Sequence, residues 1–365
     1  MKRVRLLVVL TLFLAAASLE ASGEGEHHIW LKAIALAEQG VAEAEYSLGG
    51  FYENGSGVPQ DYAIAREWYR KAAEQDFAGA QFSLGSLYYQ GLGVPQDYAI
   101  ASKWYRKAAE QGVAGAQLVL GSLYSEGQGV PQDYAAASEW FRKAAEQGIA
   151  AAQFALGGLY SRGLGVPQDY AAAREWYRKA AEQGFAGAQF NLGVLYKNGS
   201  GVPQDYAIAS KWYRKAAELG DARAQFVLGS LYSEGQGVPQ DYAAASEWFR
   251  KAAEQGIAAA QFRLGLSYQD GSGVPQDYAA ASEWYRKAAE QGDAAAQNNL
   301  GGLYKTGSGV PQDSVLAYVW YNLSASQGIN VAATNRGVVE SLLTPDQVKE
   351  AQSLSQDYYR KYVKK

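Results

Sequence analysis

The sequence predicts an all-α solenoid of helix hairpins, and three observations lead to this prediction. A heptad, Gly-Xaa-Gly-Val-Pro-Gln-Asp, first occurs at residues 55–61 and returns seven times, always after 36 residues. A fixed period of this length is typical of repeat arrays. Between the heptads, apolar residues recur at helical spacing, with room for two helices in each unit. Such units pack only on their neighbours, so the 365 residues need not divide into separate globular domains.

The composition allows this fold and excludes several kinds of site. Hydrophobic residues make up 48% of the chain and aromatic residues 13%, which is enough to bury a continuous seam. The formal charge is −4, and no basic stripe of the kind found in nucleic-acid-binding proteins is visible. The chain has no cysteine, which excludes disulfides, thiolate zinc sites and a lipid anchor on an N-terminal cysteine.

The N-terminus predicts an export signal. Lys2, Arg3 and Arg5 precede an apolar run over residues 6–17, and small residues follow. We expect a signal peptide over residues 1–21, cleaved near residue 17 or 21. The alternative is an uncleaved anchor, for which the run is short. A cleaved signal predicts a periplasmic or secreted bacterial protein with no membrane span in the mature chain.

The segment before each heptad predicts a helix, here called helix A. In the second repeat, Ala80, Leu84 and Tyr88 lie on one helical face, and Gly91 ends the helix in the left-handed conformation. Gly85 stands within this helix and recurs in all eight repeats, although a mid-helix glycine costs about 1 kcal/mol relative to alanine. We therefore predict a close approach at this glycine by the bulky Trp and Tyr of the following helix.

The heptad predicts a tight connection to a second helix, here called helix B, over residues 98–111. Gly93 supplies backbone freedom, Pro95 fixes φ, and Asp97 is placed to cap the new helix. Trp, Tyr and Ala recur at helical spacing along it, and Gly112 ends it. A sugar-stacking platform is one interpretation of the aromatic ladder, but its spacing with small alanines favours core packing.

The ends of the array depart from the repeat, as terminal caps do. Residues 27–40 predict a lone helix B that forms an N-terminal half-repeat or cap. Eight repeats follow over residues 41–328. Residues 329–365 predict C-terminal capping helices, the last of which starts at a Thr-Pro-Asp-Gln capping box over residues 344–347.

One block of the array is present twice. Residues 121–154 are identical to residues 229–262, which lie three periods further along the chain. We infer that a three-repeat block was duplicated, so much of the uniformity of the repeats reflects recent ancestry.

The repeated residues resemble those of the Sel1-like repeat family, relatives of tetratricopeptide arrays with a slightly longer unit. The matching positions in the second repeat are Ala80, Leu84, Gly85, Tyr88, Gly91, Gly93, Val94, Asp97, Ala101, Trp104, Tyr105, Lys107, Ala108, Ala109 and Gly112. The resemblance implies a right-handed α/α superhelical solenoid whose members mediate protein–protein contacts in signalling, polysaccharide export, envelope regulation and host-cell entry. One cysteine-rich branch is linked to β-lactam binding or hydrolysis, and the absence of cysteine here counts against that branch.

No catalytic or metal-binding constellation is visible in the sequence. The only histidines, His27 and His28, are adjacent and do not share a helix face, so we predict no metal site and no Ser-His-Asp arrangement. The carboxylates are explained by helix caps and solvated helix faces. We therefore predict a protein that is not an enzyme and binds no cofactor. A hydrolase of the β-lactam or cell-wall type and a polysaccharide-export module are the alternatives.

Helix A carries one face that barely varies between repeats and a second that varies freely, here called the variable face. Its positions are those of Gly79, Ser83, Ser86 and Gln90, with Tyr89 beside them. Because A helices line the concave side of hairpin solenoids, we predict a groove there for a protein or peptide partner of unknown identity. Neutral drift on an exposed surface is the alternative. The candidate contact residues are Tyr89, Asn191, Lys197, Arg263 and Asn299.

Overall fold

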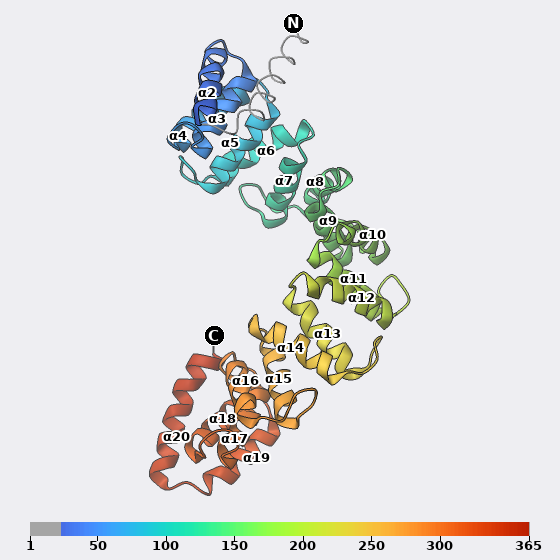
Figure 1. Ribbon diagram of the computed structural model, residues 1–365, viewed down its shortest axis with the longest axis vertical. Coiled ribbons are helices and arrows are strands. Elements are labelled where there is room, and N and C mark those ends of the chain that lie inside the picture. The colour runs from blue at the N-terminus through green and yellow to red at the C-terminus, as the bar shows by residue number, and fades with distance from the viewer. Residues whose placement is uncertain (1–22, 365) are drawn as a thin grey trace. The chain divides into compact units, whose positions relative to one another are not determined.

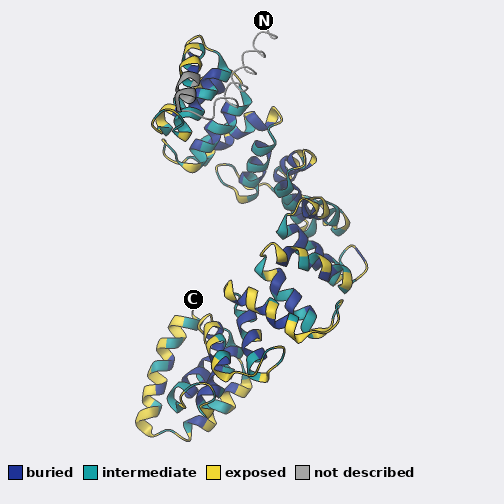
Figure 2. Cartoon of the chain, in the orientation of Figure 1, coloured by how far each residue is buried: buried dark blue, intermediate teal, exposed yellow. Residues whose placement is uncertain are grey.

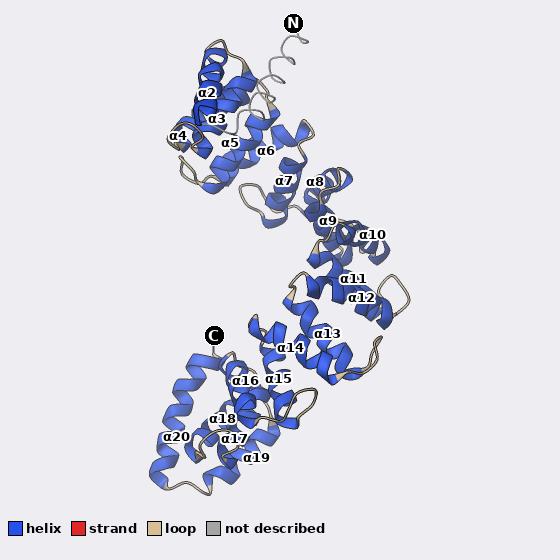
Figure 3. Cartoon of the chain, viewed as in Figure 1, coloured by secondary structure: helices blue, strands red, loops and turns tan. Residues whose placement is uncertain are grey.

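The computed structural model describes residues 23–364, with side chains from Trp30 onward. Within these residues all regular secondary structure is helical, as predicted, and short loops join the helices (Figure 3). It forms two compact units, Met1–Gln183 and Gly184–Lys365, here called the N-terminal and C-terminal units. The predicted signal peptide over residues 1–21 and the side chains of His27 and His28 lie outside the described residues.

Helices A and B alternate along each unit, and helices that follow one another in a hairpin pack side by side (Figure 1). The helices of the N-terminal unit are α2 (Gly23–Ala37), α3 (Ala42–Asn54), α4 (Tyr62–Glu74), α5 (Ala78–Gln90), α6 (Tyr98–Glu110), α7 (Ala114–Glu126), α8 (Tyr134–Glu146), α9 (Ala150–Arg162) and α10 (Tyr170–Glu182). Those of the C-terminal unit are α11 (Ala186–Asn198), α12 (Tyr206–Glu218), α13 (Ala222–Glu234), α14 (Tyr242–Glu254), α15 (Ala258–Asp270), α16 (Tyr278–Glu290), α17 (Ala294–Thr306), α18 (Ser314–Ser326), α19 (Asn330–Glu340), α20 (Pro345–Tyr358) and the π-helical turn η1 (Tyr359–Val363).

The heptad forms the turn from helix A to helix B, as its residues predict. In the second repeat, Gly91 adopts φ 73° and its N–H donates to the Leu87 carbonyl at 2.9 Å, which closes α5. The Asp97 carboxylate accepts from the Ile100 N–H at 2.8 Å and starts α6. The Gln96 side chain donates to a carbonyl in the last turn of α5 at 2.7 Å. The first glycine, the glutamine and the aspartate of the heptad thus end one helix, hold the turn and start the next helix.

A tyrosine ring explains the glycine inside helix A. A Cβ atom built at Gly85 would lie 3.0 Å from the ring of Tyr105, which is buried between α5 and α6. In all eight repeats the nearest ring at this glycine belongs to a Tyr or Phe of helix B. The prediction of a close approach is therefore confirmed for the tyrosine, but it is wrong for the tryptophan. Trp104 is half-buried instead, with the Lys107 Nζ 4.7 Å from its ring centroid.

Buried glutamines tie neighbouring hairpins together, a feature that the sequence analysis did not predict. Gln81 on α5 has no exposed surface, and its Nε2 donates to the Ala73 carbonyl of α4 at 3.2 Å. Its side-chain oxygen accepts from the Gln111 Nε2 at 2.8 Å, at the end of α6. The amide is thus satisfied on both sides, as a buried polar group requires. In the first repeat Glu45 takes this place, and burial raises the pKa of its carboxyl.

The C-terminal helices close the array with a largely polar surface. The predicted capping box is present: the Thr344 N–H donates to the Gln347 side chain at 3.0 Å, and the Gln347 N–H donates to the Thr344 Oγ1 at 3.3 Å. α20 packs on α18, buries Ala351 and Ser355, and leaves most of its other side chains exposed (Figure 2). None of the helices in the described residues is long and apolar enough to cross a membrane.

Candidate functional site

A row of tyrosine hydroxyl groups from helix B reaches the variable face. The Tyr105 Oη donates to the Ser86 Oγ at 3.1 Å, and the Tyr285 Oη donates to the Gln269 side-chain oxygen at 2.9 Å. Both rings are buried and pack against aromatic side chains of helix A, and their hydroxyl groups reach the variable face. The variable face is therefore fixed to the core by rigid aromatic groups, although its own residues change from repeat to repeat.

Burial raises the pKa of these phenols. Loss of solvation raises the pKa of Tyr105 to about 12 from an ordinary value of 10.0, and its bond with Ser86 opposes this shift only in part. Loss of solvation also raises the pKa of Tyr213 and Tyr285. The folded chain therefore favours the neutral hydroxyl at these positions.

We expect the folded protein to lose stability above pH 10. Because the folded pKa of Tyr105 lies above the unfolded one, the folded chain holds more protons between pH 10.0 and about 12, and the free energy of unfolding falls as the pH rises through that window. A pKa difference of this size corresponds to roughly 3 kcal/mol for this residue. Tyr105→Phe, which copies Phe141 and Phe249, should move the alkaline unfolding midpoint upward. Circular dichroism followed against pH tests this, and identical midpoints for the two proteins would contradict it.

The predicted contact residues lie on A helices, four of them in the C-terminal unit. Asn191 and Lys197 are half-buried on α11, Arg263 is exposed on α15, and Asn299 is half-buried on α17. Tyr89 lies on α5 in the N-terminal unit. Arg263 and Asn299 occupy the same position in successive repeats, whereas α11 is separated from α15 by a whole hairpin. The structure thus places the four residues along one series of A helices and does not gather them into one cluster.

Two of these residues already contact the tyrosine row. The Asn299 Nδ2 donates to the Tyr285 Oη at 3.3 Å. The ring of Tyr89 is half-buried and packs edge-on against Tyr98 and Tyr105, with centroid distances of 5.2 and 6.3 Å. Tyr89 is therefore not the freely exposed aromatic surface that a sugar-stacking platform needs.

A small notch opens in the variable face at Arg263, between α13, α14 and α15. Its volume is about 160 Å³. The row of hydroxyl groups is interrupted here, because Phe249 takes the tyrosine position and gives the notch an apolar floor. The lining residues are Ser233, Tyr242, Ala245, Phe249, Arg263, Leu266, Ser267, Asp270 and Ser272.

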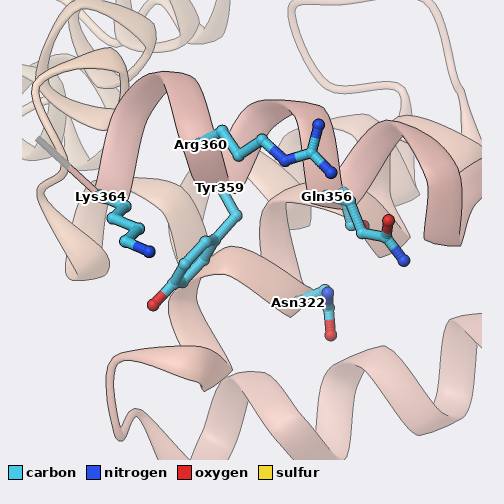
Figure 4. A pocket seen from close by; sticks show the side chains of 6 residues that line it. Asn322, Gln356, Tyr359, Arg360 and Lys364 are labelled. Carbon is cyan, nitrogen blue, oxygen red and sulfur yellow. The ribbon is translucent and has the colours of Figure 1, made fainter.

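A second cavity, of about 390 Å³, lies between α18 and the last helical segment of the chain (Figure 4). The Asn322 side-chain oxygen at its edge accepts from the Arg336 Nη1 at 2.6 Å. The sequence analysis did not predict this cavity, and the available signal is the loss of the usual Arg-Lys pair at residues 322–323. Its lining residues are Asn322, Ser355, Gln356, Tyr359, Arg360 and Lys364.

The chemistry of both places suits recognition by hydrogen bonds, charge and aromatic contact. The variable face offers hydroxyl and amide groups, with exposed guanidinium groups at Arg162, Arg223 and Arg263. In the part of the chain that the structure describes, no group of three or more His, Cys, Asp or Glu side chains is placed to hold a metal ion.

Comparison with known proteins places the repeats in a family. The family model described as Sel1 repeat matches residues 42–77, 78–113, 114–149, 150–185, 186–221, 222–257, 258–293 and 294–329. A solved Sel1 repeat protein from Oxalobacter formigenes is 37% identical, with 88% of this chain and 91% of that chain covered and a TM-score of 0.67. A protective antigen of uropathogenic Escherichia coli, described as displaying an SLR fold, is 36% identical over 96% of this chain and 94% of that chain, with a TM-score of 0.49.

A curated relative shares a much shorter stretch. The chitin synthase regulator SKT5 of Malassezia restricta is 49% identical over 47 residues, which are 13% of this chain and 3% of that protein. Sel1 repeat proteins are generally non-catalytic scaffolds for protein–protein interaction. With eight matched repeats over most of its length, this chain belongs to the Sel1 repeat family.

Proposed function

We propose that this chain is an exported scaffold that holds a protein or peptide partner on the variable face of its C-terminal unit, in the bacterial envelope or outside the cell. The notch at Arg263 carries the proposal, because it joins an exposed guanidinium to an apolar floor on the face where the repeats differ most. Arginine and aromatic residues are enriched among the side chains that dominate binding energy at interfaces.

Three further features support a partner on this face. The Asn299 amide lies one repeat beyond Arg263 and is held by the Tyr285 hydroxyl, so its orientation is set before binding. Lys197 and Asn191 add a positive charge and a second amide on α11. The basic and apolar pattern of residues 1–21 supports export.

The test is capture of a partner by crosslinking in cells, with the tagged mature chain and identification by mass spectrometry. Arg263→Ala combined with Asn299→Ala should lower the yield of the captured partner about tenfold, the loss expected when side chains important for binding are truncated. Circular dichroism of the purified variant checks that it folds. Surface substitutions of this kind are expected to change the free energy of unfolding by no more than about 1 kcal/mol. An unchanged yield would show that the variable face does not hold the partner.

A further inference from the structure

Helix α15 departs from the other A helices at two adjacent residues. Six of the other seven A helices have leucine at the position of Ser267, and those leucines are at most 5% exposed. In α15 the usual order is inverted, so that Leu266 moves to the variable face and Ser267 takes the core position. The Ser267 Oγ donates back to the Arg263 carbonyl at 3.2 Å, within the same helix.

This inversion is costly for the fold. Loss of a buried leucine side chain costs about 2–5 kcal/mol when a smaller residue replaces it. Leu266 does not restore that burial in full, because it is only partly buried and lines the notch instead. Local departures from good packing of this kind are expected chiefly at functional sites.

The duplicated block shows that the departure lies in α15 alone. The α13 and α14 lining residues, from Ser233 to Phe249, fall inside the block that is repeated, so the same residues occur in the first copy. Arg263, Leu266 and Asp270 lie just beyond the block, where the first copy has Ala, Gly and Arg instead. The notch is therefore formed by an unchanged half and a half that is particular to α15.

An equivalent position in the N-terminal unit shows which side chain fits this place. Tyr89 is the counterpart of Ser233, and its ring lies against Tyr98 and Tyr105, the counterparts of Tyr242 and Phe249. Where helix A supplies a tyrosine, that tyrosine packs on these two rings. At Ser233 the chain supplies only a small side chain, and no tyrosine of helix A covers the Tyr242 ring, which is 46% exposed, while Phe249 stays buried beneath it.

Two side chains of opposite charge on α15 flank the notch. Arg263 and Asp270 are both exposed and lie seven residues apart on α15, about 10.5 Å along the helix axis. They are too far apart to neutralise each other, and an extended peptide covers that distance in about three residues.

We propose that the notch receives an aromatic side chain of an extended peptide segment, which carries an acidic residue toward Arg263 and a basic residue toward Asp270. The aromatic ring takes the place that Tyr89 fills in its own repeat. This proposal rests on the proposed scaffold function and names the kind of partner segment that the variable face recognises.

The experiment uses a displayed library of random heptapeptides, selected on the full mature chain and counter-selected on Ser233→Tyr. That substitution supplies the ring from the chain itself, as Tyr89 does, and should fill the notch without loss of stability. Enriched peptides should carry an aromatic residue with an acidic neighbour. Their affinity, measured by fluorescence anisotropy, should fall about tenfold or more in Ser233→Tyr.

Two further variants separate binding from folding. Leu266→Ser combined with Ser267→Leu restores the order of the other repeats, and it should raise the unfolding temperature while lowering peptide affinity about tenfold. Ser125→Tyr makes the same change in the first copy of the duplicated block and should leave the affinity unchanged. Failure to enrich any peptide over Ser233→Tyr, or equal losses in Ser125→Tyr and Ser233→Tyr, would overturn the proposal.

The outcome is distinguishable from failure of the scaffold function itself. If crosslinking still captures a partner through Arg263 and Asn299 but no aromatic peptide is enriched, the scaffold function stands and the notch proposal falls. If crosslinking captures no partner, the proposed scaffold function is refuted, and the notch proposal that rests on it is refuted as well.

Discussion

Replacement of Gly165 by alanine is expected to lower the free energy of unfolding by about 3 kcal/mol or more. Gly165 is the second glycine of its heptad and adopts φ +65°, where an L-residue costs about 1–2 kcal/mol. Its Cβ atom would also lie 2.1 Å from the Tyr134 carbonyl carbon and 2.3 Å from the Ala135 nitrogen. These are backbone atoms in the first turn of α8, so no side-chain rotation relieves the clash.

Gly148 offers the matched control in the same unit. It adopts φ +90°, but nothing lies within 4 Å of a Cβ atom built there. Gly148→Ala should therefore cost only the conformational part, about 1–2 kcal/mol. Urea unfolding of both variants measures the difference, and equal losses would mean that the heptad is not held against the preceding helix B as the structure shows.

Gly265→Ala is expected to destabilise the protein by about 1–3 kcal/mol, although alanine is the better helix former. The added Cβ atom would lie 2.6 Å from two ring atoms of Tyr285, whose side chain is fully buried and has no room to move away. Overpacking of this kind forces the ring or the backbone out of place, and the loss exceeds the gain in helix propensity.

Gly337 holds the same position in the degenerate last helix A, and its substitution should have the opposite sign. No atom lies within 4 Å of a Cβ atom at Gly337, because no aromatic ring from a following helix B packs beneath α19. Gly337→Ala should therefore raise the free energy of unfolding by roughly 0.5–1 kcal/mol. Thermal unfolding of the two variants checks the signs, and a loss in Gly337→Ala would refute the ring as the reason for the glycine.

The fold follows from the sequence because its signals are local and repeated. Asp97 is a residue type that favours helix N-caps, and Gly91 one that favours the left-handed end of a helix, so both signals can be recognised from neighbouring residues alone. The period then fixes which helix packs on which. The sequence does not show which of the adjacent rings, Trp104 or Tyr105, packs against Gly85, since both residues belong to an apolar helix face. Only packing shows that Tyr105 fills the space beneath Gly85.

The notch on the variable face is harder to predict from the sequence, because it is formed by residues that depart from the repeat pattern. Leu266 and Ser267 are both ordinary residues, and only their inverted order, set against the burial of the other repeats, shows the notch. Gln81 lies on an apolar helix face, which is a signal for a buried hydrogen-bond partner, but its partner Gln111 is 30 residues away. Such pairings need the three-dimensional arrangement of neighbouring hairpins.

One comparison decides whether recognition lies on the variable face or in the heptads. Gln132 and Gln276 are heptad residues whose side chains donate to carbonyls of helix A at 2.9 and 2.8 Å. A chain with both changed to alanine should capture the crosslinked partner as well as the wild type does, whereas Arg263→Ala with Asn299→Ala should capture about a tenth as much. Loss of the partner in the heptad variant, with full capture by the Arg263 and Asn299 variant, would contradict the assignment of the heptad to register and of the variable face to binding.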